Sequence, residues 1–298
     1  MSEPVLRVAQ LNVGSLLEPG WAERRFEIVA WLERLAPDVV CLQEVWQSAS
    51  HENTAGWIAE QMPEVGWHWA FGGAPFDPQL WPDPTLLFGS AILSCWPIEN
   101  HQRFSLPVAE DDDPFVSGVP WELFHARTAG LDVFSTHLAA APHQGDHRVL
   151  QVLAIDEQIK SLRGDRDVVK RSAPQRASMP PILCGDFNAE PDSDEIRFLS
   201  SLAAIDGRTT FYQDAWRVAG DGGPGYTQDW RCNPIAASLN VHRKRIDYVF
   251  VGDPYQRAGS AGRVLSAEVA FDSALTGTLA SDHAGLVVDI VWPTRPGL

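Results

Sequence analysis

Short apolar runs rich in β-branched residues alternate along the chain with amphipathic segments and with loops rich in proline and glycine. Apolar runs bounded by turn residues predict strands over residues 5–13, 38–44, 88–95, 121–127, 131–138, 180–188, 245–252 and 283–292. Segments with apolar positions three or four residues apart predict helices over residues 22–36, 146–163 and 193–202. In the first helix Phe26, Val29 and Leu32 recur at three-residue spacing, and Pro37 ends it.

Two segments depart from this pattern. Residues 164–181 are polar, and we expect a flexible insertion at the surface there. Residues 72–84 combine prolines with aromatic residues, which fits neither a helix nor a strand and places Phe76 and Trp81 on an exposed loop. Strand patterns continue on both sides of each segment, so neither is a linker. We therefore predict a single domain over residues 1–298.

The charge of the chain narrows the classes of function. Its 298 residues include 23 basic and 39 acidic side chains, which gives a formal net charge of −16. Apolar residues make up 45% of the chain, which excludes an intrinsically disordered protein. The acidity argues against a protein that coats nucleic acid, because Lys and Arg make the phosphate contacts of such proteins. It leaves room for an enzyme that meets a phosphate at one site.

The cysteines and the N-terminal segment bear on the cellular setting. Cys41, Cys95 and Cys184 lie in apolar runs, which predicts buried free thiols, and no CxxC pair indicates zinc or redox chemistry. We find neither a signal peptide nor an apolar stretch of about 18 residues, the length that spans a bilayer. We therefore expect no membrane span and a cytoplasmic location.

A set of polar residues occurs where predicted strands end or begin, together with Asp247 inside the predicted strand 245–252. These residues are Asn12, Glu44, His137, Asp186, Asn188, Asp247, Asp282 and His283. Strand ends and the loops after them are where α/β folds place reacting groups. Taken one at a time, each has an ordinary structural explanation, such as a turn at Asp186 or a satisfied core histidine at His137. Together they supply the carboxylate and amide oxygens that Mg²⁺ or Mn²⁺ prefers, with histidines for proton transfer.

Seven fragments carry a resemblance to a known family. In chain order they are QLNV, LQEV, GSAILS, STHL, GDFN, RIDYVF and SDHAGL, from Asn12 to His283. The sequence thereby resembles the endonuclease/exonuclease/phosphatase superfamily of DNase I-like enzymes. The resemblance implies an α/β fold of four layers, an α/β/β/α sandwich in which two mixed β-sheets pack face to face with helices outside.

The resemblance also implies a role for each of these positions. Glu44 would be the principal ligand of Mg²⁺ or Mn²⁺, Asp282 a further acidic ligand, and Asn12 a neighbour of the metal and its waters. Asp186 would align or deprotonate the attacking water, and Asn188 and His137 would bind the phosphate. His283 paired with Asp247 would complete the acid–base apparatus. Family members differ over whether the GDFN aspartate or the final histidine is the general base, and both assignments stay open here.

Three further residues are candidate substrate contacts. Arg148 follows the STHL strand as in related phosphodiesterases, with packing against the sheet as the alternative. Arg245 belongs to the basic cluster 242–245, which either meets an anionic substrate or is a solvated hairpin. Trp81 would form an aromatic wall beside the site. His143 and His147 have zinc-compatible spacing, but the HExxH glutamate is missing.

The function that these features indicate is Mg²⁺- or Mn²⁺-dependent hydrolysis of a phosphate ester, most simply a phosphodiester attacked in line by water. Three alternatives stay open: a DNA or RNA nuclease, which the net charge disfavours; a phosphomonoesterase on inositol phosphates or nucleotides; and an inactive binding module. The expected partner is a phosphate-ester substrate, and no protein partner is indicated.

Overall fold

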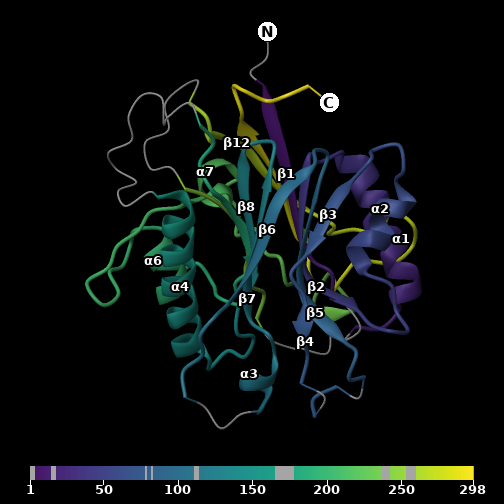
Figure 1. The fold of residues 1–298 in the computed structure, drawn as a ribbon, viewed down its shortest axis with the longest axis horizontal. Helices are drawn as coiled ribbons and strands as arrows, with labels where there is room; N and C mark the ends of the chain where they lie inside the picture. Colours follow the sequence, from purple (N-terminus) through teal and green to yellow (C-terminus); the bar gives the residue numbers. More distant parts are fainter. Residues whose placement is uncertain are drawn as a thin grey trace.

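The structure is a computed structural model that describes residues 4–14, 18–77, 79–81, 83–110, 114–164, 178–236, 242–252 and 260–297. Two mixed β-sheets lie face to face in the middle of the molecule (Figure 1). Helices α1 (Trp21–Leu35) and α2 (Thr54–Gln61) lie outside one sheet, and α4 (Gly145–Arg163) and α6 (Asp194–Leu199) lie outside the other. The predicted four-layer sandwich is confirmed.

The first sheet has seven strands in the order β12-β13-β1-β2-β5-β3, with β4 also paired to β5. Only the pair β1–β2 is parallel among these strands as described; the other pairs are antiparallel. The strands are β1 (Val5–Asn12), β2 (Val39–Gln47), β3 (His68–Phe71), β4 (Ala74–Pro75), β5 (Leu87–Ser94), β12 (Val264–Ala270) and β13 (Gly285–Val291).

The second sheet has six strands in the order β10-β11-β9-β8-β7-β6, and within its described strands β8–β9 is the parallel pair. Its strands are β6 (Ile98–Ser105), β7 (Glu122–Thr128), β8 (Leu131–His137), β9 (Ile182–Asp186), β10 (Gln213–Asp214) and β11 (Asp247–Val251). Two short helices complete the described fold, α3 (Pro114–Gly118) and α7 (Ala215–Ala219).

The core fills the space between the sheets and the space under the helices. Leu6, Cys41, Val133 and Cys184 belong to one buried cluster, in which β1 and β2 face β8 and β9. Strands covered on both faces read as continuous apolar runs, which is why VVCLQ and ILCGD showed no alternation. Burying this apolar surface is the main stabilising contribution to the sandwich.

Some expectations from the sequence need correction. Phe26 was expected on the buried face of α1, but it is 49% exposed and packs edge-on against Trp57, because a three-residue spacing drifts away from the helical period of 3.6. Phe76 was expected on an exposed loop, but it is only 8% exposed and packs against Phe88. Trp81 is half-buried against the same core cluster.

Two of the three predicted buried thiols are confirmed, and the prediction for the third was wrong. Cys41 and Cys184 are buried free thiols, whereas Cys95 is only half-buried and Cys232 is exposed. Of the segment 164–181, residues 165–177 lie outside the described residues, so its predicted flexibility is not tested. Among the described helices, none is both long and apolar enough to cross a membrane.

Candidate active site

The predicted polar residues meet at one edge of the sandwich, where β1, β2, β8 and β9 end. In the second sheet, strand register sets three of them in a row: His137 pairs with Asp186 across β8–β9, and Asp186 pairs with Asp247 across β9–β11. In the first sheet Asn12 is the last residue of β1 and lies beside Gln43 of β2. Parallel neighbours end at the same edge, so the sheet order itself gathers these side chains.

Asp186 is at the centre of the cluster and is 1% exposed. One carboxylate oxygen accepts the main-chain N–H of Asn188 at 2.8 Å, and the other accepts the Asn12 amide N–H at 3.0 Å. The Nε2 atom of His137 lies 3.5 Å from this second oxygen. A carboxylate surrounded by N–H donors is held in one orientation, as a group that aligns a reactant must be.

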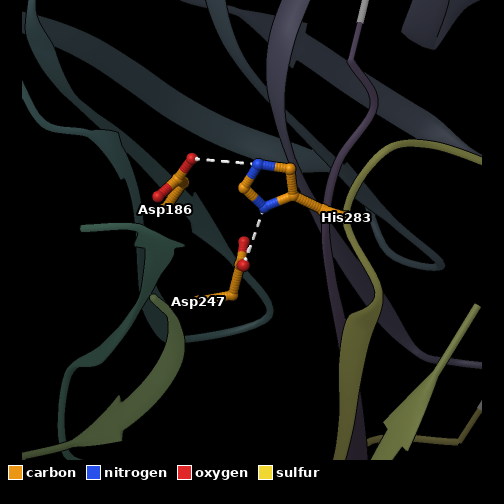
Figure 2. A group of neighbouring side chains, drawn as sticks. All are labelled: Asp186, Asp247 and His283. Atoms are coloured by element: carbon orange, nitrogen blue, oxygen red, sulfur yellow. Dashed lines mark hydrogen bonds and ion pairs between the residues drawn. The ribbon is translucent and has the colours of Figure 1, made fainter. Parts of the chain in front are cut away.

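His283 lies between two aspartates (Figure 2). Its Nδ1 is 2.9 Å from an oxygen of Asp247, and its Nε2 is 3.8 Å from an oxygen of Asp186. Asp247 is fully buried and also accepts an amide N–H from Gln10 at 3.0 Å. Burial lowers the pKa of His283, but the surrounding carboxylates, chiefly Asp247 and Asp282, outweigh it and raise that pKa well above its ordinary value.

A second group of carboxylates lies next to this cluster. Glu44 accepts an N–H from Asn12 at 3.1 Å, and it lies where a β-bulge interrupts the pairing of β2 with β5, in a left-handed conformation with φ of 55°. Burial and the neighbouring Asp282 raise the pKa of Glu44. Burial, Asp282 and Glu44 together raise the pKa of Glu18 to about 7. A bulge re-aims a side chain, here towards the other acids.

The donor set around Glu44 fits a hard divalent cation. Asp282 raises the pKa values of both Glu18 and Glu44, and Glu44 also raises the pKa of Glu18, so the three acids lie close together, as carboxylates do where a cation offsets their charge. Asp186, Asp247 and His283 also bring ligand atoms within 4.8 Å of one another. Because His283 and Asp247 are hydrogen-bonded to each other, this second trio suits proton transfer better than metal binding.

His137 and Asn188 border the cluster. The ring of His137 meets Trp121 edge-on with centroids 5.6 Å apart, and its Nδ1 is buried with no hydrogen-bond partner within the described part of the chain. Asn188 has a left-handed backbone with φ of 47°, and its amide donates to the carbonyl of Leu138 at 3.0 Å. This bond ties the turn after β9 to the end of β8, where His137 lies.

The predicted substrate residues are not brought into the cluster. Arg148 is buried, donates to Glu195 at 2.7 Å and also holds the carbonyl of Ala139. Arg245 is buried, donates to Asp214 at 2.8 Å and stacks over Tyr248. Neither they nor Trp81 has a described hydrogen bond or ion pair with the site residues. Arg148 therefore has the packing contacts that were its alternative, whereas Arg245 is in a buried ion pair and not in the solvated hairpin that was the alternative for it.

Two further members of the basic cluster 242–245 are also close to acids. His242 lies 2.6 Å from Glu190, and Arg243 lies 3.5 Å from Asp229 and over the ring of Tyr226. This leaves less positive charge for an anionic substrate than the sequence indicated.

Several site residues were missed in the sequence. Gln10 donates to both Gln43 and Asp247, which connects the two sheets behind the reacting groups. The hydroxyl of Thr227 accepts the main-chain N–H of Asp247. Gln10 could have been predicted, because a glutamine inside an apolar strand needs a buried hydrogen-bond partner. No pattern marked Thr227 or Glu18, because both lie in irregular loops.

Comparison with known proteins shows similarity to one family over most of the chain. The model of the Endonuclease/Exonuclease/phosphatase family matches residues 9–283. Among curated proteins, Nocturnin of Xenopus laevis is 24% identical over 93% of this chain and 66% of its own length. Protein angel homolog 2 of Danio rerio is 26% identical over 60% of this chain. The match spans only 30% of the length of that relative.

Solved structures show the same fold. The human Nocturnin catalytic domain with bound sulfate has a TM-score of 0.64 and 22% identity, over 96% of this chain and 93% of its own. TDP2 of D. rerio, complexed with a single-strand DNA product, has a TM-score of 0.66 and 18% identity, over 96% of this chain and 98% of its own.

Proposed function

Because this chain belongs to the endonuclease/exonuclease/phosphatase family, whose members are hydrolases that include nucleases and phosphodiesterases, we propose that it is a divalent-metal-dependent phosphoric ester hydrolase that cleaves phosphodiesters. One observation carries the proposal: polar side chains from both sheets converge on Asp186 and Glu44 at a single edge, namely Asn12, His137 and His283. An inactive binding module has no need of such a set. Burying so many carboxylates is costly unless a cation or hydrogen-bond donors offset their charge.

Glu44 and Asp282 would hold Mg²⁺ or Mn²⁺, with Asn12 and Glu18 beside it. When bound, such an ion neutralises charge on the phosphate oxygens and stabilises the leaving oxygen. The Asn12 amide donates to both Glu44 and Asp186, so it fixes the metal-binding carboxylate relative to the reacting carboxylate.

Asp186 and His283 would act as one proton-transfer unit. Their facing atoms, Oδ2 and Nε2, are 3.8 Å apart, so a water between them can be aligned by the carboxylate and exchange a proton with the imidazole. Asp247 holds Nδ1 of His283 and thereby fixes which ring nitrogen faces the water. His137 and the amide of Asn188 would donate to the phosphate oxygens, where such donors act most strongly as charge develops.

The proposal is tested by hydrolysis of bis-p-nitrophenyl phosphate in Mg²⁺, in Mn²⁺ and in EDTA. We expect activity with either metal and none in EDTA. Glu44→Ala and His283→Ala should each abolish it. A second panel of supercoiled DNA, RNA, sphingomyelin, phosphoinositides and nucleotides then identifies the substrate class.

Two exposed residues of the same types provide controls. Glu60→Ala on α2 and His68→Ala on β3 remove an acid and an imidazole from the surface, and both variants should retain wild-type rates. Substantial EDTA-resistant hydrolysis, or full activity in Glu44→Ala, would refute the metal-dependent mechanism.

A further inference from the structure

Arg24, the fourth residue of α1, is only 1% exposed, and its guanidinium is bonded to main-chain carbonyls. Nη1 donates to the carbonyl of Val13 at 2.6 Å and to that of Ala280 at 3.0 Å. Nε donates to the carbonyl of Pro19 at 2.9 Å, and Nη2 donates to the main-chain carbonyl of Glu18 at 3.2 Å. One side chain thus joins the loop after β1 to the loop before β13.

These two loops carry groups of the proposed active site. Asn12 ends β1, and its side-chain oxygen accepts the main-chain N–H of Gly14. In the other loop the hydroxyl of Ser281 donates to Asp282 at 3.1 Å and accepts the main-chain N–H of His283. The loops also touch directly, since a Cβ on Gly14 would lie 2.8 Å from an oxygen of Asp282. Any change in loop spacing therefore moves Asn12 relative to Asp282.

Arg24 also brings a permanent charge close to the acidic group. A guanidinium stays protonated in proteins, and burying its charge is costly without compensation. Burial lowers the pKa of Arg24, and Asp282, Glu18 and Glu44 counteract that shift, so these carboxylates interact with it electrostatically. The positive charge of Arg24 thus offsets part of the mutual repulsion of these carboxylates. Because the described hydrogen bonds of its guanidinium go to carbonyls, the carboxylate oxygens can bind other partners.

We propose that Arg24 is the positioning residue of the metal site, which sets the separation of the two loops so that Asn12, Glu44 and Asp282 match a divalent cation. This inference rests on the proposed function, in which these residues hold the metal. It requires the guanidinium fork, because the three nitrogens together hold four carbonyls, three in the loop after β1 and one in the loop before β13. A lysine would keep the charge but present it as a single point.

The test measures metal binding without catalysis. Binding of Mn²⁺ to wild type, Arg24→Lys and Arg24→Gln is followed by the loss of the free Mn²⁺ paramagnetic resonance signal. Partners that orient metal ligands typically contribute about 10–100-fold to affinity, so we expect the dissociation constant to rise at least about tenfold in both variants. Amide exchange at Gly14 and over residues 280–284 should be faster in both variants without metal. The Mg²⁺ concentration that gives half-maximal hydrolysis should rise by a similar factor in both variants.

Arg25→Lys is the matched control on the same helix. The guanidinium carbon of Arg25 lies 4.4 Å from the centroid of the Trp57 ring, and its Nη1 lies 3.4 Å from a carboxylate oxygen of Glu52. Arg25 has no described contact to either loop, so the Mn²⁺ affinity of this variant should equal that of wild type. Unfolding temperatures in EDTA show that each variant is folded, and Arg24→Lys carries the comparison if Arg24→Gln is not. Wild-type Mn²⁺ affinity in a folded Arg24 variant would overturn the inference. Absence of Mn²⁺ binding by the wild type would overturn the proposed function itself.

Discussion

At the scale of single residues, the Asp247–His283 pair is the contact whose chemistry is easiest to isolate. Asp247 is fully buried, and its hydrogen bond to Nδ1 of His283 is 2.9 Å long. Asp247→Asn keeps the shape but replaces the charged acceptor with a neutral amide. We expect kcat to fall about 10²-fold or more, the usual size of an acid–base contribution, with the Mg²⁺ dependence unchanged.

Steady-state kinetics at several Mg²⁺ concentrations check this prediction. Asp289→Asn is the control, because Asp289 is also a strand aspartate in a 2.8 Å contact, here with Arg7, away from the site. It should retain wild-type kcat. A kcat for Asp247→Asn equal to that of wild type would remove Asp247 from the acid–base apparatus.

Glu122 provides a prediction about stability. It is 2% exposed, accepts the main-chain N–H of Ser90 at 2.6 Å, and lies 2.8 Å from Arg103. Burial raises the pKa of Glu122 to about 8 despite these donors. The folded state therefore holds a proton that the unfolded chain releases above its ordinary pKa of about 4.3.

The sign of the effect follows from proton linkage. The stabilisation from protonated Glu122 is complete below pH 4 and is lost as the pH rises towards 8, at up to about 1.4 kcal/mol per pH unit. Urea unfolding between pH 5 and pH 8 should show this decline in wild type and a flatter profile in Glu122→Gln. Glu99→Gln, which removes an exposed acid 3.6 Å from Arg127, should keep the wild-type slope. Equal slopes in wild type and Glu122→Gln would contradict the raised pKa.

At the level of single residues, the sequence predicted the polar residues at the ends of strands. It missed residues such as Arg24, whose side chains bind main-chain carbonyls. Asn12, Asp186 and His283 stood out because a polar residue next to an apolar run needs a reason. Arg24 did not, since an arginine on an amphipathic helix is ordinarily solvent-exposed, and only the fold shows that its donors reach two loops. The assignment of Arg148 and Arg245 to substrate failed to consider buried acidic partners, which no spacing in the sequence reveals.

At the scale of elements, the predicted strands and helices form, with ends shifted by at most three residues. The short strands and helices between 54 and 118 were mostly missed, because this segment is dominated by tryptophan and proline rather than by periodic apolar positions. The bulge at Glu44 was also invisible, because it depends on how β2 pairs with β5. That bulge matters for function, since it directs a carboxylate into the acidic group.

The contact between β8 and β9 leads to a further prediction. Gly185 lies opposite Thr136, and a Cβ at this position would be 2.1 Å from the Thr136 carbonyl oxygen. Gly185→Ala must push the two strands apart next to the His137–Asp186 pair. We expect the free energy of unfolding to fall by about 1–3 kcal/mol, as overpacked sites do, and hydrolysis to weaken as well.

Urea unfolding and hydrolysis assays on the same preparation check both expectations. Gly297→Ala is the control, because a Cβ there meets nothing within 4 Å. If Gly185→Ala is as stable as wild type, the strands tolerate more separation than their register indicates.

At the scale of the whole molecule, the site exists because two sheets are stacked. The first sheet supplies Asn12 and Glu44, and the second supplies His137, Asp186 and Asp247. Gln10 crosses the interface between them. Strand patterns alone did not give this stacking, because every buried strand looks alike in the sequence. The four layers and the two mixed sheets packed face to face were predicted through the family resemblance, which the fold comparisons confirm, whereas the order of strands within each sheet was not predicted.

The net charge of −16 belongs to this scale and leads to a prediction about salt. A strongly acidic surface repels an anionic substrate as it approaches, and salt screens that repulsion, with a Debye length that falls from about 30 Å at 0.01 M to about 8 Å at 0.15 M. At saturating Mg²⁺ we therefore expect kcat/KM to rise over this range of NaCl. The rise should be steeper for a short oligonucleotide than for singly charged bis-p-nitrophenyl phosphate. A basic nuclease behaves in the opposite way, because salt weakens its phosphate contacts. A kcat/KM that falls steeply with salt would show that a positively charged track dominates substrate approach, which is the behaviour that the composition of this chain argues against.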